Sequence, residues 1–211
     1  DFILATARNY LSRPPARRDV LSVFAGVRPL IRSGEAKNTA VLSRDHLIEI
    51  GESGLVTVTG GKWTTYRRMA EDCINQAAVL AKLPEKDCRT QNLKIHGFAE
   101  NTERFSNLSA YGADAIEIQK LIESDQPLGD KLHKDLPYTI AEVLWAVRNE
   151  MARTVEDVLA RRTRALFLNA RAAVECAPQI AEILERELGK DDFWAKEQIE
   201  KFSATARKYA T

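Results

Sequence analysis

Residues 55–67 read LVTVTGGKWTTYR, and this stretch decides the fold of the first part of the chain. Apolar and polar residues alternate over residues 55–59, which predicts a half-buried strand. Two glycines follow, and the pattern from Tyr66 to about Leu83 predicts a helix. The order of strand, glycine turn and helix places Gly60–Thr65 at a helix N-terminus.

A helix N-terminus presents unpaired amides and a partial positive charge, which suit a phosphate, a carboxylate or a polarised carbonyl oxygen. Gly60 and Gly61 allow a ligand to approach the backbone closely, Lys62 adds a positive charge, and Thr64 and Thr65 add hydroxyls. Such a site could stabilise negative charge on a flavin ring. The alternative is a plain strand-to-helix turn in which Thr64 or Thr65 is the cap. The spacing matches neither a Walker loop nor a dinucleotide fingerprint.

The residues before this stretch also predict mixed α/β structure. Residues 46–50 resemble a second strand, and the intervening residues 51–54, GESG, are typical of a hairpin turn. Residues 1–12 predict a helix that two prolines end. The apolar run 20–29 is strand-like until its final proline.

After about residue 97 the pattern predicts helix after helix. Capping patterns begin at Thr139 and Thr154, each followed three residues later by an acid. Residues 163–188 predict a long helix, interrupted at Pro178 and closed by Gly189, with one further helix behind it. No linker separates the two parts, so we expect two abutting domains, residues 1–84 and residues 97–211.

Composition is that of a soluble globular protein. Of 211 residues, 45% are hydrophobic and 29% are charged, with a net charge of +1. This balance argues against nucleic acid as a partner, and no apolar run approaches the ~20 residues of a membrane span. The three cysteines and three histidines show no metal-ligand spacing. Because the sequence begins without methionine and inside a helical pattern, we expect a piece of a longer protein.

Two arginines are candidates for binding an anion. Arg28 ends a strongly apolar run, where a charge is costly unless it is paired or solvated, and Arg44 follows in the sequence SRD. Guanidinium groups bind phosphate oxygens bidentately, so two converging arginines suit a phosphorylated substrate. For Arg44, an ion pair with Asp45 or another nearby acid is the alternative.

Residues 148–164 are rich in arginine, but acids are interleaved at helical spacing. Glu150 and Arg153 are three apart, and Asp157 and Arg161 are four apart, which predicts ion pairs. A basic groove for nucleic acid is the alternative, and the acids argue against it. The tryptophans of this part, Trp145 and Trp194, are interpreted as packing residues.

Five segments together resemble FAD-dependent glycerol-3-phosphate dehydrogenase, in order and approximate spacing. The resemblance covers nearly the whole chain, and the segments are 19–30, DVLSVFAGVRPL; 42–46, LSRDH; 60–67, GGKWTTYR; 136–138, LPY; and 150–164, EMARTVEDVLARRTR. It implies a fold of the α/β plus all-α class: the C-terminal end of an FAD/NAD(P)-binding flavoenzyme (DAO-like) domain, followed by a helical C-terminal domain.

The same resemblance implies oxidation of sn-glycerol 3-phosphate to dihydroxyacetone phosphate, with FAD as cofactor and a membrane quinone as acceptor. The implied enzyme is peripheral, on the cytoplasmic face of a bacterial membrane, and mitochondrial relatives exist. Arg28 and Arg44 match the family's substrate arginines, and Lys62 matches its active-site lysine near the flavin. Gly60, Gly61, Lys62, Trp63, Thr64 and Thr65 match the turn that contacts the flavin ring, and Trp63 replaces a leucine that is common there.

The sequence also departs from the family. It contains no GxGxxG, so the main FAD fingerprint and further substrate contacts are expected in a missing N-terminal part, and the chain alone is expected to be inactive. Two alternatives stay open: a glycerophosphate oxidase that reduces oxygen, and a non-enzymatic helical interaction module at residues 97–211. A homodimer is a candidate assembly.

Overall fold

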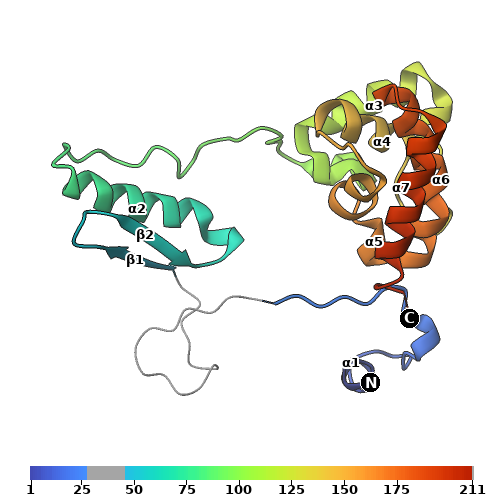
Figure 1. Ribbon diagram of the computed structural model, residues 1–211, viewed down its shortest axis with the longest axis horizontal. Helices are drawn as coiled ribbons and strands as arrows, with labels where there is room; N and C mark the ends of the chain where they lie inside the picture. The colour runs from blue at the N-terminus through green and yellow to red at the C-terminus, as the bar shows by residue number, and fades with distance from the viewer. Residues whose placement is uncertain (28–45, 211) are drawn as a thin grey trace. The chain divides into compact units, whose positions relative to one another are not determined.

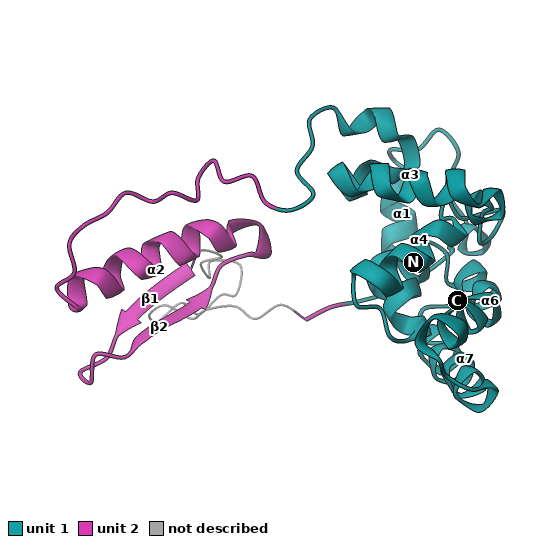
Figure 2. Cartoon of the chain, turned by 90° about the horizontal axis from the view of Figure 1, so that it is seen from above, with its two compact units in different colours: residues 1–25, 96–211 teal, residues 26–95 magenta. Residues whose placement is uncertain are grey.

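The computed structural model describes residues 1–27 and 46–210 and divides the chain into two compact units. One unit contains residues 1–25 and 96–211, and the other contains residues 26–95 (Figure 2). This division differs from the expected boundary, because residues 1–25 pack with the helical part rather than with the strands. The assignment of residues 1–84 to a flavin domain of the intact protein stays a prediction.

The unit of residues 26–95 contains the predicted hairpin. Strands β1, His46–Ile50, and β2, Val56–Gly60, pair antiparallel, with His46 opposite Gly60 and Ile50 opposite Val56. Gly54 has a φ of +82°, and its amide donates to the carbonyl of Gly51 at 2.9 Å, closing the turn. The alternation of residue types therefore predicted both strands and their connection.

A helix follows the second strand directly. A 3-10 turn, η3 (Trp63–Thr65), leads into α2, Tyr66–Leu80, which packs along the hairpin (Figure 1). The helix ends three residues before the predicted Leu83, and the chain then turns through Lys82 with a φ of +53°. Strand, glycine turn and helix thus follow one another as predicted.

The N-terminal segment is less regular than its sequence predicts. Helix α1 covers only Phe2–Ala7, and one 3-10 turn, η1, covers Arg17–Asp19. The described part of the run 20–29 is not a strand, so that prediction was wrong. Two of its backbone groups instead bond to distant parts of the helical unit: the Val23 amide donates to the Tyr209 carbonyl at 2.8 Å, and the Leu21 carbonyl accepts from the Ala170 amide at 3.0 Å.

The helical unit continues with short elements. They are η4 (Thr102–Asp114), a 3-10 segment; α3 (Ala115–Ser124); and η5 (Gln126–Gly129). Gly112, inside η4, has a φ of +57°, and a Cβ there would lie 1.8 Å from the carbonyl oxygen of Gly97. Only glycine fits this position, because the backbone at Gly97 passes so close that the next amide, Ala113, donates to it at 2.9 Å.

The remaining helices form most of the core. They are α4 (Ile140–Asn149), the π-helical turn η6 (Asp157–Arg162), α5 (Ala165–Leu168), α6 (Ala170–Leu188) and α7 (Asp192–Ala206). Helices α6 and α7 lie side by side (Figure 1), and residues such as Leu159, Ile180 and Phe202 are almost fully buried. Each such side chain contributes about 1.5–3 kcal/mol through burial. Trp145 and Trp194 are partly buried against the core, which confirms them as packing residues.

The long helix predicted over residues 163–188 is broken at a different position. Asn169 is extended, with φ −156° and ψ 92°, and its side chain accepts from the Ala172 amide at 3.1 Å, so α6 begins there. Pro178 lies inside α6 without ending it, because buried neighbours such as Ala177 and Ile180 hold the helix on the core. Gly189 ends α6 with a φ of +61°, as predicted.

Candidate functional site

The glycine turn is shaped by two left-handed residues. Gly60 and Gly61 both have a φ of +75°, which most side chains disfavour. A Cβ on Gly61 would lie 2.4 Å from the Sδ atom of Met69, so this turn also packs tightly against α2. The two glycines are therefore required by the backbone itself, whether or not a ligand approaches it.

The Thr65 side chain closes the 3-10 turn that precedes α2. The Lys62 amide donates to the Thr65 hydroxyl oxygen at 3.1 Å, and that hydroxyl donates back to the Lys62 carbonyl at 3.0 Å. The Lys62 side chain is exposed, and no carboxylate of the described residues lies within 4.0 Å of its ammonium group. Thr65 stands at the N-cap position of α2, but its side chain makes no capping hydrogen bond to that helix. The Lys62 ammonium remains available to a ligand.

Trp63 presents a large apolar surface beside the glycine turn. Its side chain is 86% exposed and stacks on Tyr66 with ring centroids 5.5 Å apart and an angle of 25° between the rings. The first amides of the turn, those of Trp63 and Thr64, have no partner in a preceding helical turn. The turn thus combines a cation, helix-start amides and an aromatic face.

One polar contact next to this turn was missed from the sequence. His46, which faces Gly60 across the hairpin, lies with its Nε2 atom 3.0 Å from the Oδ2 atom of Asp72. Arg68 lies on the other side of the same carboxylate, 3.2 Å from Oδ1. A strand residue and a helix residue meet here through tertiary packing, and no local pattern indicates the contact.

Other site predictions remain untested. Arg28 and Arg44 lie outside the described residues, so their convergence stays a prediction. The described residues contain no group of three or more His, Cys, Asp or Glu side chains arranged to hold a metal ion, and the three cysteines are free thiols. None of the helices that the structure describes is long and apolar enough to span a membrane.

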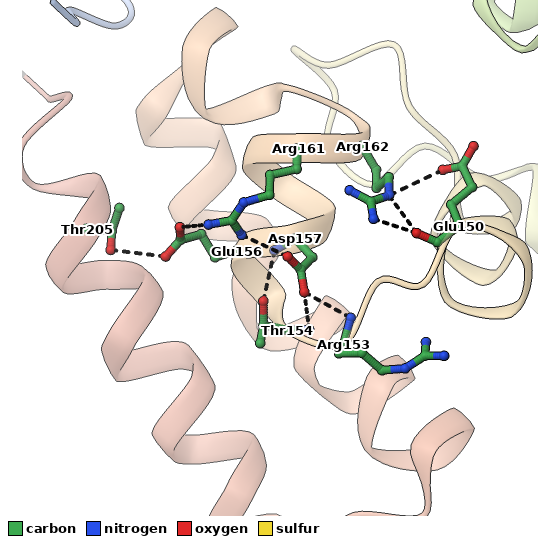
Figure 3. Close-up of polar contacts among 8 residues, drawn as sticks. All are labelled: Glu150, Arg153, Thr154, Glu156, Asp157, Arg161, Arg162 and Thr205. Atoms are coloured by element: carbon green, nitrogen blue, oxygen red, sulfur yellow. Dashed lines mark hydrogen bonds and ion pairs between the residues drawn. The ribbon is translucent and has the colours of Figure 1, made fainter. Parts of the chain in front are cut away.

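The arginine-rich segment is held together by ion pairs and caps (Figure 3). The Asp157 carboxylate accepts from the amides of Arg153 and Thr154, each at 3.0 Å, and from Arg161 at 2.8 Å. The Asp157 amide in turn donates to the Thr154 hydroxyl, which completes the predicted capping box. Burial alone would raise the pKa of Asp157, but these donors together lower it.

Two neighbouring arginines extend this network, and one predicted pair is wrong. Arg161 also pairs with Glu156, whose other oxygen accepts from Thr205 of α7 at 3.4 Å (Figure 3). The predicted partner of Glu150 was Arg153, but Arg162 takes that place, with its Nε atom 3.8 Å from Oε2. The acids of residues 150–157 and the side chains of Arg161 and Arg162 therefore form structural ion pairs, as the ion-pair interpretation predicted.

Known proteins match this chain over nearly its full length. The sequence profile of the C-terminal domain of alpha-glycerophosphate oxidase matches residues 56–197, which is more than half of the chain. The chain belongs to this family. The predicted resemblance is thereby confirmed, and the family's match includes both the glycine turn and the arginine-rich segment.

Individual proteins that are similar to this chain support the same family. Human mitochondrial glycerol-3-phosphate dehydrogenase is 39% identical over 99% of this chain and 31% of its own length, and the Arabidopsis thaliana mitochondrial enzyme is 34% identical over 95% and 37%. The chain therefore spans about a third of the curated relatives it matches. A solved structure of glycerol-3-phosphate dehydrogenase from Bacillus halodurans, complexed with FAD, has a TM-score of 0.70 and 22% identity over the whole chain and 45% of its own. This likeness confirms the predicted fold class.

Proposed function

We propose that the intact protein containing this chain is an FAD-dependent glycerol-3-phosphate dehydrogenase. It oxidises sn-glycerol 3-phosphate to dihydroxyacetone phosphate. The observation that carries the proposal is 39% identity to the human mitochondrial enzyme over 99% of the chain. Because the chain spans 31% of that relative, the activity belongs to the intact protein and needs residues beyond this chain.

The residues of the glycine turn fit one edge of a flavin ring. Lys62 offers an ammonium group without a carboxylate within 4.0 Å among the described residues, and the helix-start amides offer further donors. Such donors suit the electron-rich oxygen and nitrogen atoms of the flavin ring. The exposed Trp63 side chain offers an apolar surface beside these donors. The rest of the cofactor needs a phosphate-binding fingerprint that this sequence does not contain.

Each predicted residue has one proposed role. Arg28 and Arg44 bind the substrate phosphate, for which paired guanidinium groups are suited. Lys62 stabilises negative charge on the substrate oxygen or on the adjacent ring edge. When bound, FAD supplies the acceptor for the hydride that leaves the carbinol carbon. The residues of this chain thus position the substrate and stabilise charge.

The roles are tested in the full-length protein by steady-state kinetics with glycerol 3-phosphate. Lys62→Ala should lower kcat by about 10²–10³-fold, because a charge-stabilising donor is lost. Arg28→Ala should mainly raise KM, by about 10–100-fold, because hydrogen bonds between charged groups contribute about 1.5–3 kcal/mol. Matched controls are Lys86→Ala and Arg13→Ala, two exposed residues with no proposed role. Unchanged kinetics in both test variants would refute the assignments.

A membrane quinone is the proposed electron acceptor, and oxygen is the second candidate. The dehydrogenase names of the relatives favour the first, and the oxidase in the family's description favours the second. Purified intact protein, supplied with glycerol 3-phosphate, should reduce a soluble quinone without stoichiometric peroxide. Peroxide formation at a rate equal to substrate oxidation would assign the oxidase instead.

The proposed location is peripheral, on the inner face of a bacterial cytoplasmic membrane, where a quinone is within reach. The mitochondrial names of the relatives make the corresponding organelle membrane the alternative. Washing membranes from the source cells with sodium carbonate should release the protein. Retention in the washed membranes would contradict peripheral attachment.

A further inference from the structure

A cavity of about 750 Å³ lies within the helical unit, and its lining includes no residue of the proposed flavin and substrate site. Residues 96–114 form part of its wall, and Tyr138, Glu142 and the turn 161–164 form much of the rest. Three arginines, Arg161, Arg162 and Arg164, come from this one turn. A ligand can use only those of the three positive charges that carboxylates and carbonyls of the protein do not already neutralise.

Two of the three arginines are held by the protein. Arg161 pairs with Glu156 and with Asp157. Arg162 donates from its Nε atom to the Glu150 carbonyl at 2.9 Å and lies 3.8 Å from the Glu150 carboxylate (Figure 3). Both guanidinium groups are therefore engaged by acceptors of the protein, and these contacts stabilise the π-helical turn.

The acids around the cavity are also occupied. The Glu142 carboxylate accepts from the Thr139 amide at 2.7 Å and from the Tyr111 hydroxyl at 3.1 Å. The Asp114 carboxylate lies 2.8 Å from the Nε2 atom of His96. None of these acids needs a further cation to be satisfied.

Arg164 is the exception. No carboxylate of the described residues lies within 4.0 Å of its guanidinium group, and its side chain is exposed at the cavity wall. Its backbone is left-handed, with a φ of +58°, a conformation that costs a residue other than glycine about 1–2 kcal/mol. Strain of this kind concentrates at functional sites.

The surroundings of Arg164 supply hydrogen-bond donors. Tyr138 lines the same cavity; burial raises the pKa of its phenol, and the positive charge of Arg164 partly offsets this rise. Asn107 and Ser109 line the cavity as well. A cation with neighbouring hydroxyl and amide donors matches an oxyanion, which accepts several hydrogen bonds at once.

We propose that this cavity binds a small molecule through its oxyanion group, a phosphoryl or a carboxylate, with the Arg164 guanidinium as the main contact and the Tyr138 hydroxyl as a second donor. The volume lies in the range of small-molecule sites, so the oxyanion can carry an organic group. The proposed substrate arginines are not among the residues that line the cavity, and this proposal does not depend on the proposed function.

The test uses the full-length protein with Arg28→Ala and Arg44→Ala in place, which removes the proposed substrate phosphate site. Calorimetric titrations with inorganic phosphate and with acetate are compared, so that the stronger probe tells a phosphoryl from a carboxylate. Arg164→Gln should weaken binding of the preferred anion at least tenfold. The matched control is Arg171→Gln, an exposed arginine of α6 that does not line the cavity, and it should leave binding unchanged.

Two further variants keep the outcome decisive. Arg164→Lys retains the charge without the bidentate donors and should weaken binding less than Arg164→Gln, which gives a readout even if the glutamine variant misfolds. Tyr138→Phe removes one donor and should weaken binding several-fold. The proposal is overturned if neither anion binds, or if the substitutions at Arg164 weaken binding no more than Arg171→Gln does.

Discussion

The Tyr111 hydroxyl donates a hydrogen bond of 3.1 Å to the Glu142 carboxylate and thereby joins the 3-10 segment before α3 to the first turn of α4. The Glu142 residue is only 2% exposed, so this carboxylate depends on protein donors. Its other oxygen accepts from both the amide and the hydroxyl of Thr139. The acid of the predicted capping box therefore also connects two helical segments.

Tyr111→Phe should lower the free energy of unfolding of the intact protein by about 1.5–3 kcal/mol, because a buried charged acceptor loses one donor. Urea denaturation monitored by circular dichroism measures the change. Tyr10→Phe is the control, because Tyr10 is 83% exposed. An equal effect of the two substitutions would show that the hydrogen bond does not contribute.

Glu142 should make stability depend on pH in an unusual direction. Burial raises the pKa of this carboxyl above its ordinary value of 4.5, although the Thr139 donors partly offset the rise. As the pH increases from 4.5 through the folded-state pKa, the unfolded chain loses the proton first, so the folded state becomes less stable. The stability of the wild type relative to Glu142→Gln should fall over this window. Denaturation midpoints of both proteins, measured at a series of pH values, give this difference in stability. A difference that rises over the same window would contradict a raised pKa of Glu142.

Asp157 should have the opposite effect in the same measurement. Burial favours a higher pKa, but the Arg153 and Thr154 donors and the Arg161 charge bring it below 3.8. The stability from these contacts is present above pH 3.8 and is lost as the pH falls through the folded-state pKa. The advantage of the wild type over Asp157→Asn should therefore disappear on acidification. An advantage that does not change as the pH falls below 3.8, or that grows, would argue against a lowered pKa.

Gly61→Ala should destabilise the hairpin and α2. The new Cβ would meet Met69 at 2.4 Å in a left-handed conformation that itself costs about 1–2 kcal/mol. Hydrogen exchange of residues 46–80, followed by mass spectrometry on the intact protein, should become faster. Gly51→Ala is a suitable comparison, because the nearest atom to its Cβ would be 3.8 Å away. Similar exchange in the two variants would contradict the close packing of the turn.

The cysteines should differ in reactivity towards iodoacetamide. The Thr90 hydrogen bonds lower the pKa of Cys88, and Arg67 contributes, so more of this thiol is ionised near neutral pH. Burial raises the pKa of Cys176 to about 11 and also blocks access. Peptide mapping after brief alkylation should find Cys88 modified and Cys176 intact. Modification of Cys176 at the same rate would contradict both points.

Local patterns predicted the parts of the fold that depend on neighbours in sequence. Alternation predicted both strands, and the capping signals at Thr154 and Gly189 predicted a helix start and a helix end. The break at Asn169 and the tolerance of Pro178 depend on tertiary packing, which no local propensity contains. Residues 20–27 are as apolar as a strand, but helix ends rather than a strand satisfy their backbone.

The candidate site was predictable in the same limited sense. The glycine turn and the threonine hydroxyl that closes the next 3-10 turn follow from residue types, because left-handed glycines and short hydroxyl side chains have local preferences. The pair of His46 and Asp72 does not follow, since a strand and a helix must first pack together. Nor does the partner of Glu150, because helical spacing suggests Arg153 and the turn at η6 brings Arg162 closer.

The unit of residues 26–95 is inserted into the helical unit, because the chain leaves that unit after Ala25 and returns to it at His96. The segment before the insertion is bound through the Val23 amide, the Ser22 hydroxyl and the Phe24 ring. The ends of the insertion are therefore joined to the helical unit when the insertion unfolds. Closing such a loop of about 70 residues costs about 4 kcal/mol of free energy, because the looped chain has fewer conformations than a free chain. A single protease cut within the insertion would remove this constraint.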